Sequence, residues 1–92
     1  MFHTTTLSDR DDIFTCHELE PSAYLWAKGV RFVGIEPAPT ANNPRHVVFR
    51  FQHPPEVCRE ELSAYERGAE IPARLFALAL RQLKDQIFAR IN

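Results

Sequence analysis

Glycine is scarce in this sequence: the chain of 92 residues contains only three, at positions 29, 34 and 68. The phosphate-binding loops of P-loop proteins and Rossmann folds need several closely spaced glycines, because the backbone must approach the phosphates directly. Three isolated glycines do not make such a loop. The sequence therefore excludes both types of nucleotide-binding loop.

Cysteines and long apolar segments are also few. The two cysteines, Cys16 and Cys58, lie far apart, and without a secretion signal we interpret them as free thiols. No segment approaches the roughly 20 apolar residues that cross a membrane. The opening residues, MFHTTTLSDRDD, are polar and acidic rather than a leader peptide. We expect a cytoplasmic protein that has no membrane partner.

An excess of positive charge is missing as well, since the formal net charge is −1. The whole molecule therefore has no basic field to attract nucleic acid. The charges are unevenly placed, however: residues 55–70 contain five Glu and two Arg, whereas residues 72–92 contain four basic residues and one Asp. We interpret these segments as two solvated helix faces that attract each other.

Side chains for catalysis or metal binding do not form a recognisable pattern. Cys16 and His17 are adjacent, so in a strand they point to opposite faces and do not pair as nucleophile and base. None of the ligand spacings of zinc sites occurs. The carboxylates of Glu56 and Glu60 share a solvent-facing side of a predicted helix. We predict that the protein is not an enzyme and has no metal or cofactor.

The apolar and turn residues predict one α+β domain over residues 13–92, preceded by a flexible tail at residues 1–12. In this prediction, helices pack on one face of a small antiparallel sheet. The long loop at 37–45 connects two strands that pair with each other. The expected elements are strands at 13–17, 30–36 and 46–52, and helices at 18–28, 55–67 and 72–91.

Two glycines have specific predicted roles. Gly29 follows Lys28 at the end of the first helix, where a cation complements the helix dipole and glycine adopts the left-handed conformation that ends many helices. Gly34 interrupts the next strand and marks either a bulge or a close approach of another backbone. We therefore interpret the Ala-Lys-Gly turn as structural.

The sheet face turned away from the helices is the predicted interaction site. The strand HVVFRFQ directs Val47, Phe49 and Phe51 to one face, which we assign to the core. The register of the hairpin is not determined by the sequence, and we favour the one that keeps Phe32 in the core. The predicted outer-face residues are then Arg31, Val33, Ile35, His46, Val48 and Arg50.

The last helix carries more apolar residues than a small monomer easily covers. Its main apolar stripe consists of Phe76, Leu80, Leu83, Ile87 and Ile91. Three more large apolar residues, Leu75, Leu78 and Phe88, lie off that stripe.

The segments SAYLWAKGVRFVGIE, HVVFRF and LFALALRQLKDQIF, with a Pro-Glu helix start before the third, resemble a family of small bacterial and phage domains of unknown function. That family carries a similar Ala-Tyr-Leu-x-Ala-Lys-Gly turn, a Phe-x-Phe strand and a closing Leu-Lys-Asp helix. The resemblance covers about residues 13–90, and this chain departs from it at Pro21 and in the loop 37–45. It implies the same α+β architecture and transfers no catalytic residue.

The sequence as a whole predicts a small interaction module that forms a homodimer through the open sheet face, the terminal helix, or both. A heterologous protein is the second alternative, with the domain acting as an adaptor or inhibitor. Single-stranded nucleic acid, bound by Arg31 and Arg50, is the third alternative. It is less favoured, because the phenylalanines of VFRFQ point inward in this prediction and the net charge is negative.

Overall fold

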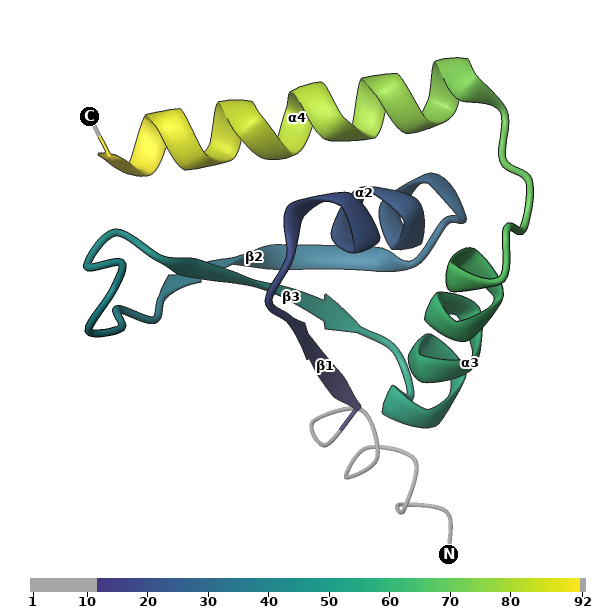
Figure 1. Cartoon of the computed structure of the whole chain (residues 1–92), viewed down its shortest axis with the longest axis horizontal. Helices are drawn as coiled ribbons and strands as arrows, with labels where there is room; N and C mark the ends of the chain where they lie inside the picture. Colours follow the sequence, from purple (N-terminus) through teal and green to yellow (C-terminus); the bar gives the residue numbers. More distant parts are fainter. Residues whose placement is uncertain (1–11, 92) are drawn as a thin grey trace, which may run out of the picture.

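The computed structural model describes residues 12–91, which form three strands and three helices in the order predicted above (Figure 1). The expected α+β fold with a small antiparallel sheet is confirmed. The predicted tail at residues 1–12 lies outside the described residues, apart from Asp12. The elements are β1 (Ile13–Cys16), α2 (Leu19–Ala27), β2 (Arg31–Pro37), β3 (Val47–Gln52), α3 (Pro55–Glu66) and α4 (Ala73–Ile91).

Strand β3 lies in the middle of the sheet and pairs antiparallel with both β1 and β2. Phe51 of β3 lies opposite Phe14 of β1 and opposite Phe32 of β2. The rings of Phe32 and Phe51 meet edge to face, with centroids 5.5 Å apart. Three phenylalanines thus form a row across the sheet, and this row faces the helices.

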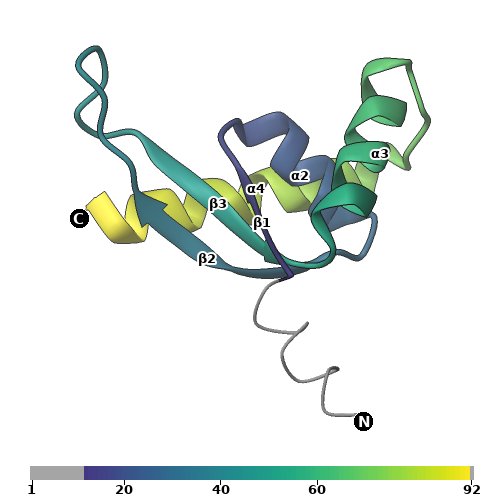
Figure 2. The same cartoon turned by 90° about the horizontal axis from the view of Figure 1, so that it is seen from below.

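The helices lie on one side of the sheet. Figure 1 shows α2 between the sheet and α4, with α3 at one end of the molecule. Helix α2 is the inner helix, and its Ala23 and Leu25 side chains are fully buried against the sheet and α4. The opposite face of the sheet carries no helix from the described part of the chain (Figure 2).

The turn between α2 and β2 ends the helix as predicted. Gly29 has a φ of +94°, and its N–H donates to the carbonyl of Trp26 at 2.9 Å. Lys28, directly before it, places Nζ 3.9 Å from Oε1 of Glu61 and so connects the end of α2 to α3. The Ala-Lys-Gly segment therefore has a complete structural explanation.

Strand β2 contains a β-bulge at the predicted glycine. Phe32 lies opposite Phe51, but the next residue of β2 with a partner is Gly34, opposite Arg50, so Val33 is the extra residue. Gly34 has a φ of +145°, a conformation that residues with a side chain rarely adopt. The bulge shifts the alternation of β2 by one residue beyond this point.

Helix α4 buries its predicted stripe and exposes the additional apolar residues. Leu83 is fully buried, and Phe76, Leu80 and Ile87 pack against the core; the side chain of Ile91 lies outside the described part. The exposed fractions of the residues off the stripe are 44% for Leu75, 48% for Leu78 and 62% for Phe88.

The acidic and basic segments form separate surfaces rather than a contact. The ion pairs recorded for residues 12–91 are Lys28–Glu61 and Arg50–Glu36, and neither joins α3 to α4. The two helix faces that we expected to attract each other therefore do not pair directly. Helix α3 stays an acidic surface and α4 a basic one.

We predict that Gly34→Ala destabilises the fold by roughly 1–2 kcal/mol, because alanine resists the positive φ of the bulge. Space is not the reason, since no atom outside Gly34 and its two chain neighbours lies within 4 Å of the position that a Cβ would occupy. Urea denaturation of both proteins measures the difference. The control is Val33→Ala at the neighbouring exposed position, which we expect to change stability by less than about 0.5 kcal/mol. Equal stabilities of Gly34→Ala and wild type would contradict the assigned bulge.

Candidate functional site

The outer face of the sheet contains five of the six predicted interaction residues. Arg31, Val48 and Arg50 lie there by register, opposite the row of phenylalanines. Val33 protrudes at the bulge and is 46% exposed. His46 directly precedes β3 and stacks on His17, with ring centroids 6.2 Å apart.

The sixth residue, Ile35, was placed on the wrong face. It lies opposite Phe49 and packs against the core. The prediction assumed uninterrupted alternation from Arg31 to Ile35, whereas the bulge after Phe32 reverses the alternation. Phe32 and Ile35 therefore both face the core.

The outer face is less apolar than the residue pattern predicts. Val48 has an exposed fraction of only 6%, so it offers little surface to a partner. Nη1 of Arg50 donates a hydrogen bond to Oε2 of Glu36 at 2.7 Å, which forms an ion pair on the same face. Of the predicted residues, Val33 is the one apolar side chain on this face that is well exposed.

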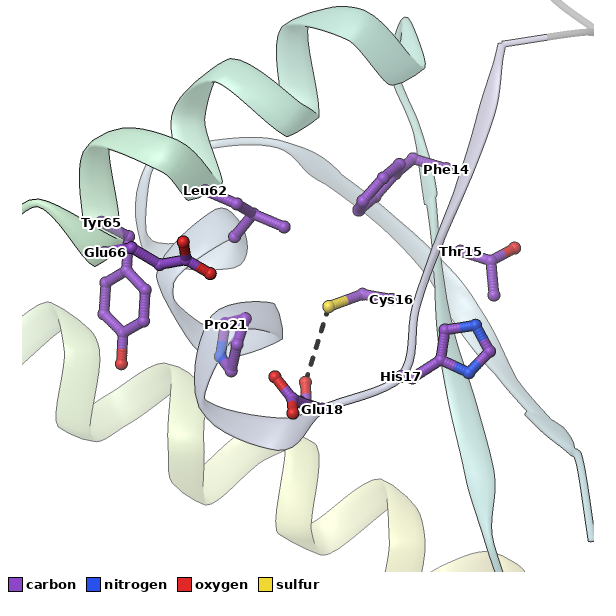
Figure 3. A pocket seen from close by; sticks show the side chains of 9 residues that line it. All are labelled: Phe14, Thr15, Cys16, His17, Glu18, Pro21, Leu62, Tyr65 and Glu66. Atoms are coloured by element: carbon purple, nitrogen blue, oxygen red, sulfur yellow. Dashed lines mark hydrogen bonds between the residues drawn. The ribbon is translucent and has the colours of Figure 1, made fainter. Parts of the chain in front are cut away.

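A pocket that the sequence analysis did not predict lies between β1, the start of α2, and α3. Its volume is about 270 Å³. Figure 3 shows Phe14 and Cys16 pointing into it from β1, and Leu62 and Tyr65 approaching from α3. The helical spacing of Leu62 and Tyr65 was visible in the sequence. The pairing of β1, which brings that strand beside α3, was not.

The two cysteines are free thiols in the core, as predicted. Cys58 on α3 is fully buried, and burial raises the pKa of its thiol from 9.0 to about 11, with Cys16 nearby adding to the rise. Since the thiolate is the reactive form, Cys58 is inert near neutral pH. Cys16 lines the pocket, and its Sγ donates a weak hydrogen bond to the carbonyl of Glu18 at 3.6 Å.

No group of three His, Cys, Asp or Glu side chains within residues 12–91 is arranged to hold a metal ion. The stacked pair of His17 and His46 supplies two imidazoles and no third ligand from the described residues. In the same part of the chain, none of the helices is long and apolar enough to cross a membrane.

Comparison of the chain with protein-family models, curated proteins and solved structures found no match. The resemblance to small bacterial and phage domains therefore stays a prediction. Function has to be argued from the surfaces of the molecule.

The raised pKa of Cys58 predicts a loss of stability in alkaline solution. Above about pH 9 the unfolded thiol ionises, while the folded thiol keeps its proton to about pH 11. Unfolding then releases a proton, so the free energy of unfolding falls between these pH values, by at most about 1.4 kcal/mol per pH unit.

Urea denaturation of the wild type and of Cys58→Ala at several pH values between 7 and about 11 tests this prediction. The two proteins differ only at position 58, so the difference between the two curves reports the Cys58 thiol. We expect the wild type to lose stability more steeply above about pH 9. Parallel curves would show that the Cys58 thiol ionises equally in the folded and unfolded states.

Proposed function

We propose that this chain is a non-enzymatic interaction domain that forms a two-fold homodimer through the solvent side of α4. The observation that supports this proposal is a set of four exposed side chains on that helix, which we name the α4 stripe: Leu78, Arg81, Asp85 and Phe88. The spacing of three or four residues places all of them on one side of the helix.

All four residues of the α4 stripe are exposed, and Leu78 at its border also lines a pocket with Trp26 and Ala27 of α2. Leu78 and Phe88 are 48% and 62% exposed, so a partner could cover a large part of both side chains. Burial of one large apolar side chain contributes roughly 1.5–3 kcal/mol when complete. Exposed apolar residues at regular spacing on one helix are typical of a surface that packs against another helix.

The order of residues in the α4 stripe favours a second copy of the same chain. Leu78 and Phe88 lie equally far from Leu83 along the helix, and so do Arg81 and Asp85. Two copies of α4 could pack antiparallel about a two-fold axis that lies level with Leu83 along the helix. Leu78 of each copy then meets Phe88 of the other, and Arg81 of each copy meets Asp85 of the other. Such self-complementarity is what an isologous interface requires.

The alternatives receive less support from the same surfaces. The outer sheet face remains a candidate contact, but Ile35 is in the core and Val48 is covered. For single-stranded nucleic acid, the Arg50 guanidinium already pairs with Glu36, and the phenylalanines of β3 point into the core. A helix from a different protein could also pack on the α4 stripe, but such a contact does not require the symmetric order of the four residues.

A charge reversal tests the two-fold pairing. Arg81→Asp places an aspartate opposite Asp85 of the second copy in both halves of the interface, so the dimer should weaken by roughly tenfold. Asp85→Arg should weaken it similarly through Arg81. The double variant Arg81→Asp/Asp85→Arg restores opposite charges and should regain most of the affinity. Sedimentation equilibrium over a range of protein concentrations measures each dissociation constant.

The matched control is Arg59→Asp, which makes the same charge change at an exposed position on α3, away from the α4 stripe. We expect it to leave the dissociation constant within about twofold of the wild type, since surface charges away from the contact are largely screened. A monomeric wild type at about 100 µM, the strength of a weak transient contact, would refute the proposal. So would single variants that behave like the control.

A further inference from the structure

The outer edge of β1 is open to pairing with another strand. β1 lies at the edge of the sheet, and within residues 12–91 no strand pairs with its other side. The His53 N–H donates to the Asp12 carbonyl at 2.8 Å, which identifies the Asp12–His53 pair as one that shares hydrogen bonds. Because such pairs alternate in antiparallel strands, Phe14 and Cys16 also bond to β3.

The same alternation directs the N–H and C=O groups of Ile13 and Thr15 toward the open edge. Thr15 is exposed at this edge strand. An unpaired strand edge is a template for an incoming extended chain.

The pocket described above lies directly beside this edge. In Figure 3, β1 forms one wall and α3 forms the other, with Pro21 of α2 at the base. Phe14, Cys16, Leu62 and Tyr65 make the lining largely apolar, and a volume of about 270 Å³ accommodates one bulky aliphatic side chain. A strand that pairs with β1 would direct alternate side chains to the face of the sheet on which this pocket lies.

The rim of the pocket is acidic. The carboxylates of Glu18 and Glu66 both line it, from the start of α2 and from the last turn of α3, and both residues are exposed. No ion pair with either residue is recorded among the described residues. The rest of α3 is acidic as well, so the pocket lies on the negative side of the molecule.

We propose that β1 and α3 form a groove that binds an extended peptide segment of another protein, in which Lys or Arg flanks a bulky aliphatic residue at alternate positions. The peptide adds to the sheet as an antiparallel strand beside β1, and its aliphatic side chain enters the pocket. The basic side chains on the same face then approach Glu18 and Glu66. The backbone hydrogen bonds supply sequence-independent affinity, and the pocket and its rim supply selectivity.

This groove is separate from the α4 stripe, so the inference stands or fails independently of the proposed dimer. If both hold, each dimer presents two identical grooves. Two linked grooves would bind a partner that carries two such segments more tightly than one groove alone.

The probe is a fluorescein-labelled peptide, acetyl-Thr-Lys-Thr-Leu-Thr-Lys-Thr-amide, titrated with the full chain and followed by fluorescence anisotropy. Its leucine and lysines share one face, and its threonines carry the N–H groups that would meet β1. We expect saturable binding that weakens at least tenfold when the two threonines beside the leucine are N-methylated, since two backbone hydrogen bonds are lost. Replacing both lysines by glutamates should abolish binding.

Variants of the protein test the same contacts from the other side. Thr15→Pro removes the outward N–H at an edge position, where proline is tolerated, and should weaken binding about tenfold. Thr15→Val keeps the N–H and should bind like the wild type. Glu66→Lys should weaken binding about threefold, whereas Glu60→Lys, with the same charge change on α3 away from the pocket, should not.

Each outcome decides for or against the groove. The absence of saturable binding at protein concentrations up to about 1 mM refutes it. If the N-methylated peptide binds as tightly as the unmodified peptide, strand addition is refuted. If the glutamate peptide binds as tightly as the lysine peptide, the role of the acidic rim is refuted. If Thr15→Pro does not fold, the N-methylated peptide still tests the hydrogen bonds with the wild-type protein. Thr15→Pro could also fold, dissociate an oligomer into smaller species and leave the affinity for the peptide unchanged. The edge of β1 would then be a contact between copies of this chain, and the inference would be wrong.

Discussion

The contact on which the rest of the structure depends is the row of three phenylalanines across the sheet. Phe51 lies opposite Phe14 on one side and Phe32 on the other, so one residue of β3 marks the register of both neighbouring strands. A slip of one residue in either strand would move its phenylalanine to the solvent face. The row also belongs to the core in which Leu25 of α2 is packed, and α4 covers α2 on the side away from the sheet (Figure 1). Strand order, layer order and the position of the groove beside β1 follow from this one arrangement.

The bulge in β2 decides what each face of the sheet contains. By admitting Val33 as an extra residue, it lets Phe32 and Ile35 both reach the core. The same shift leaves Glu36 on the outer face, where its carboxylate accepts the hydrogen bond from Arg50. In a strand without the bulge, Ile35 would lie on the solvent face of the sheet instead of in the core. The face without helices therefore exposes one large apolar side chain among the predicted residues, Val33, beside the Arg50–Glu36 ion pair.

The separation of charge between helices gives the molecule two sides with different chemistry. Helix α3 carries four Glu and one Arg and borders the groove, while α4 carries four basic residues and one Asp and contains the self-complementary stripe. Because no recorded ion pair joins these helices, neither charge is neutralised by the other. A dimer formed through α4 would leave both acidic grooves accessible. Self-association and peptide binding are compatible on this geometry.

Residue patterns along the chain were enough to predict the element order, the helix ending at Lys28 and Gly29, and the inward direction of Phe49 and Phe51. These features depend on local propensity and on the spacing of apolar residues, which one chain displays directly. The patterns did not determine that β1 pairs with β3, nor that the bulge turns Ile35 inward. Both depend on which distant backbone groups pair, and that is decided only when strands compete for one buried surface. The pocket beside Cys16 follows from this pairing, which is why only the tertiary structure revealed it.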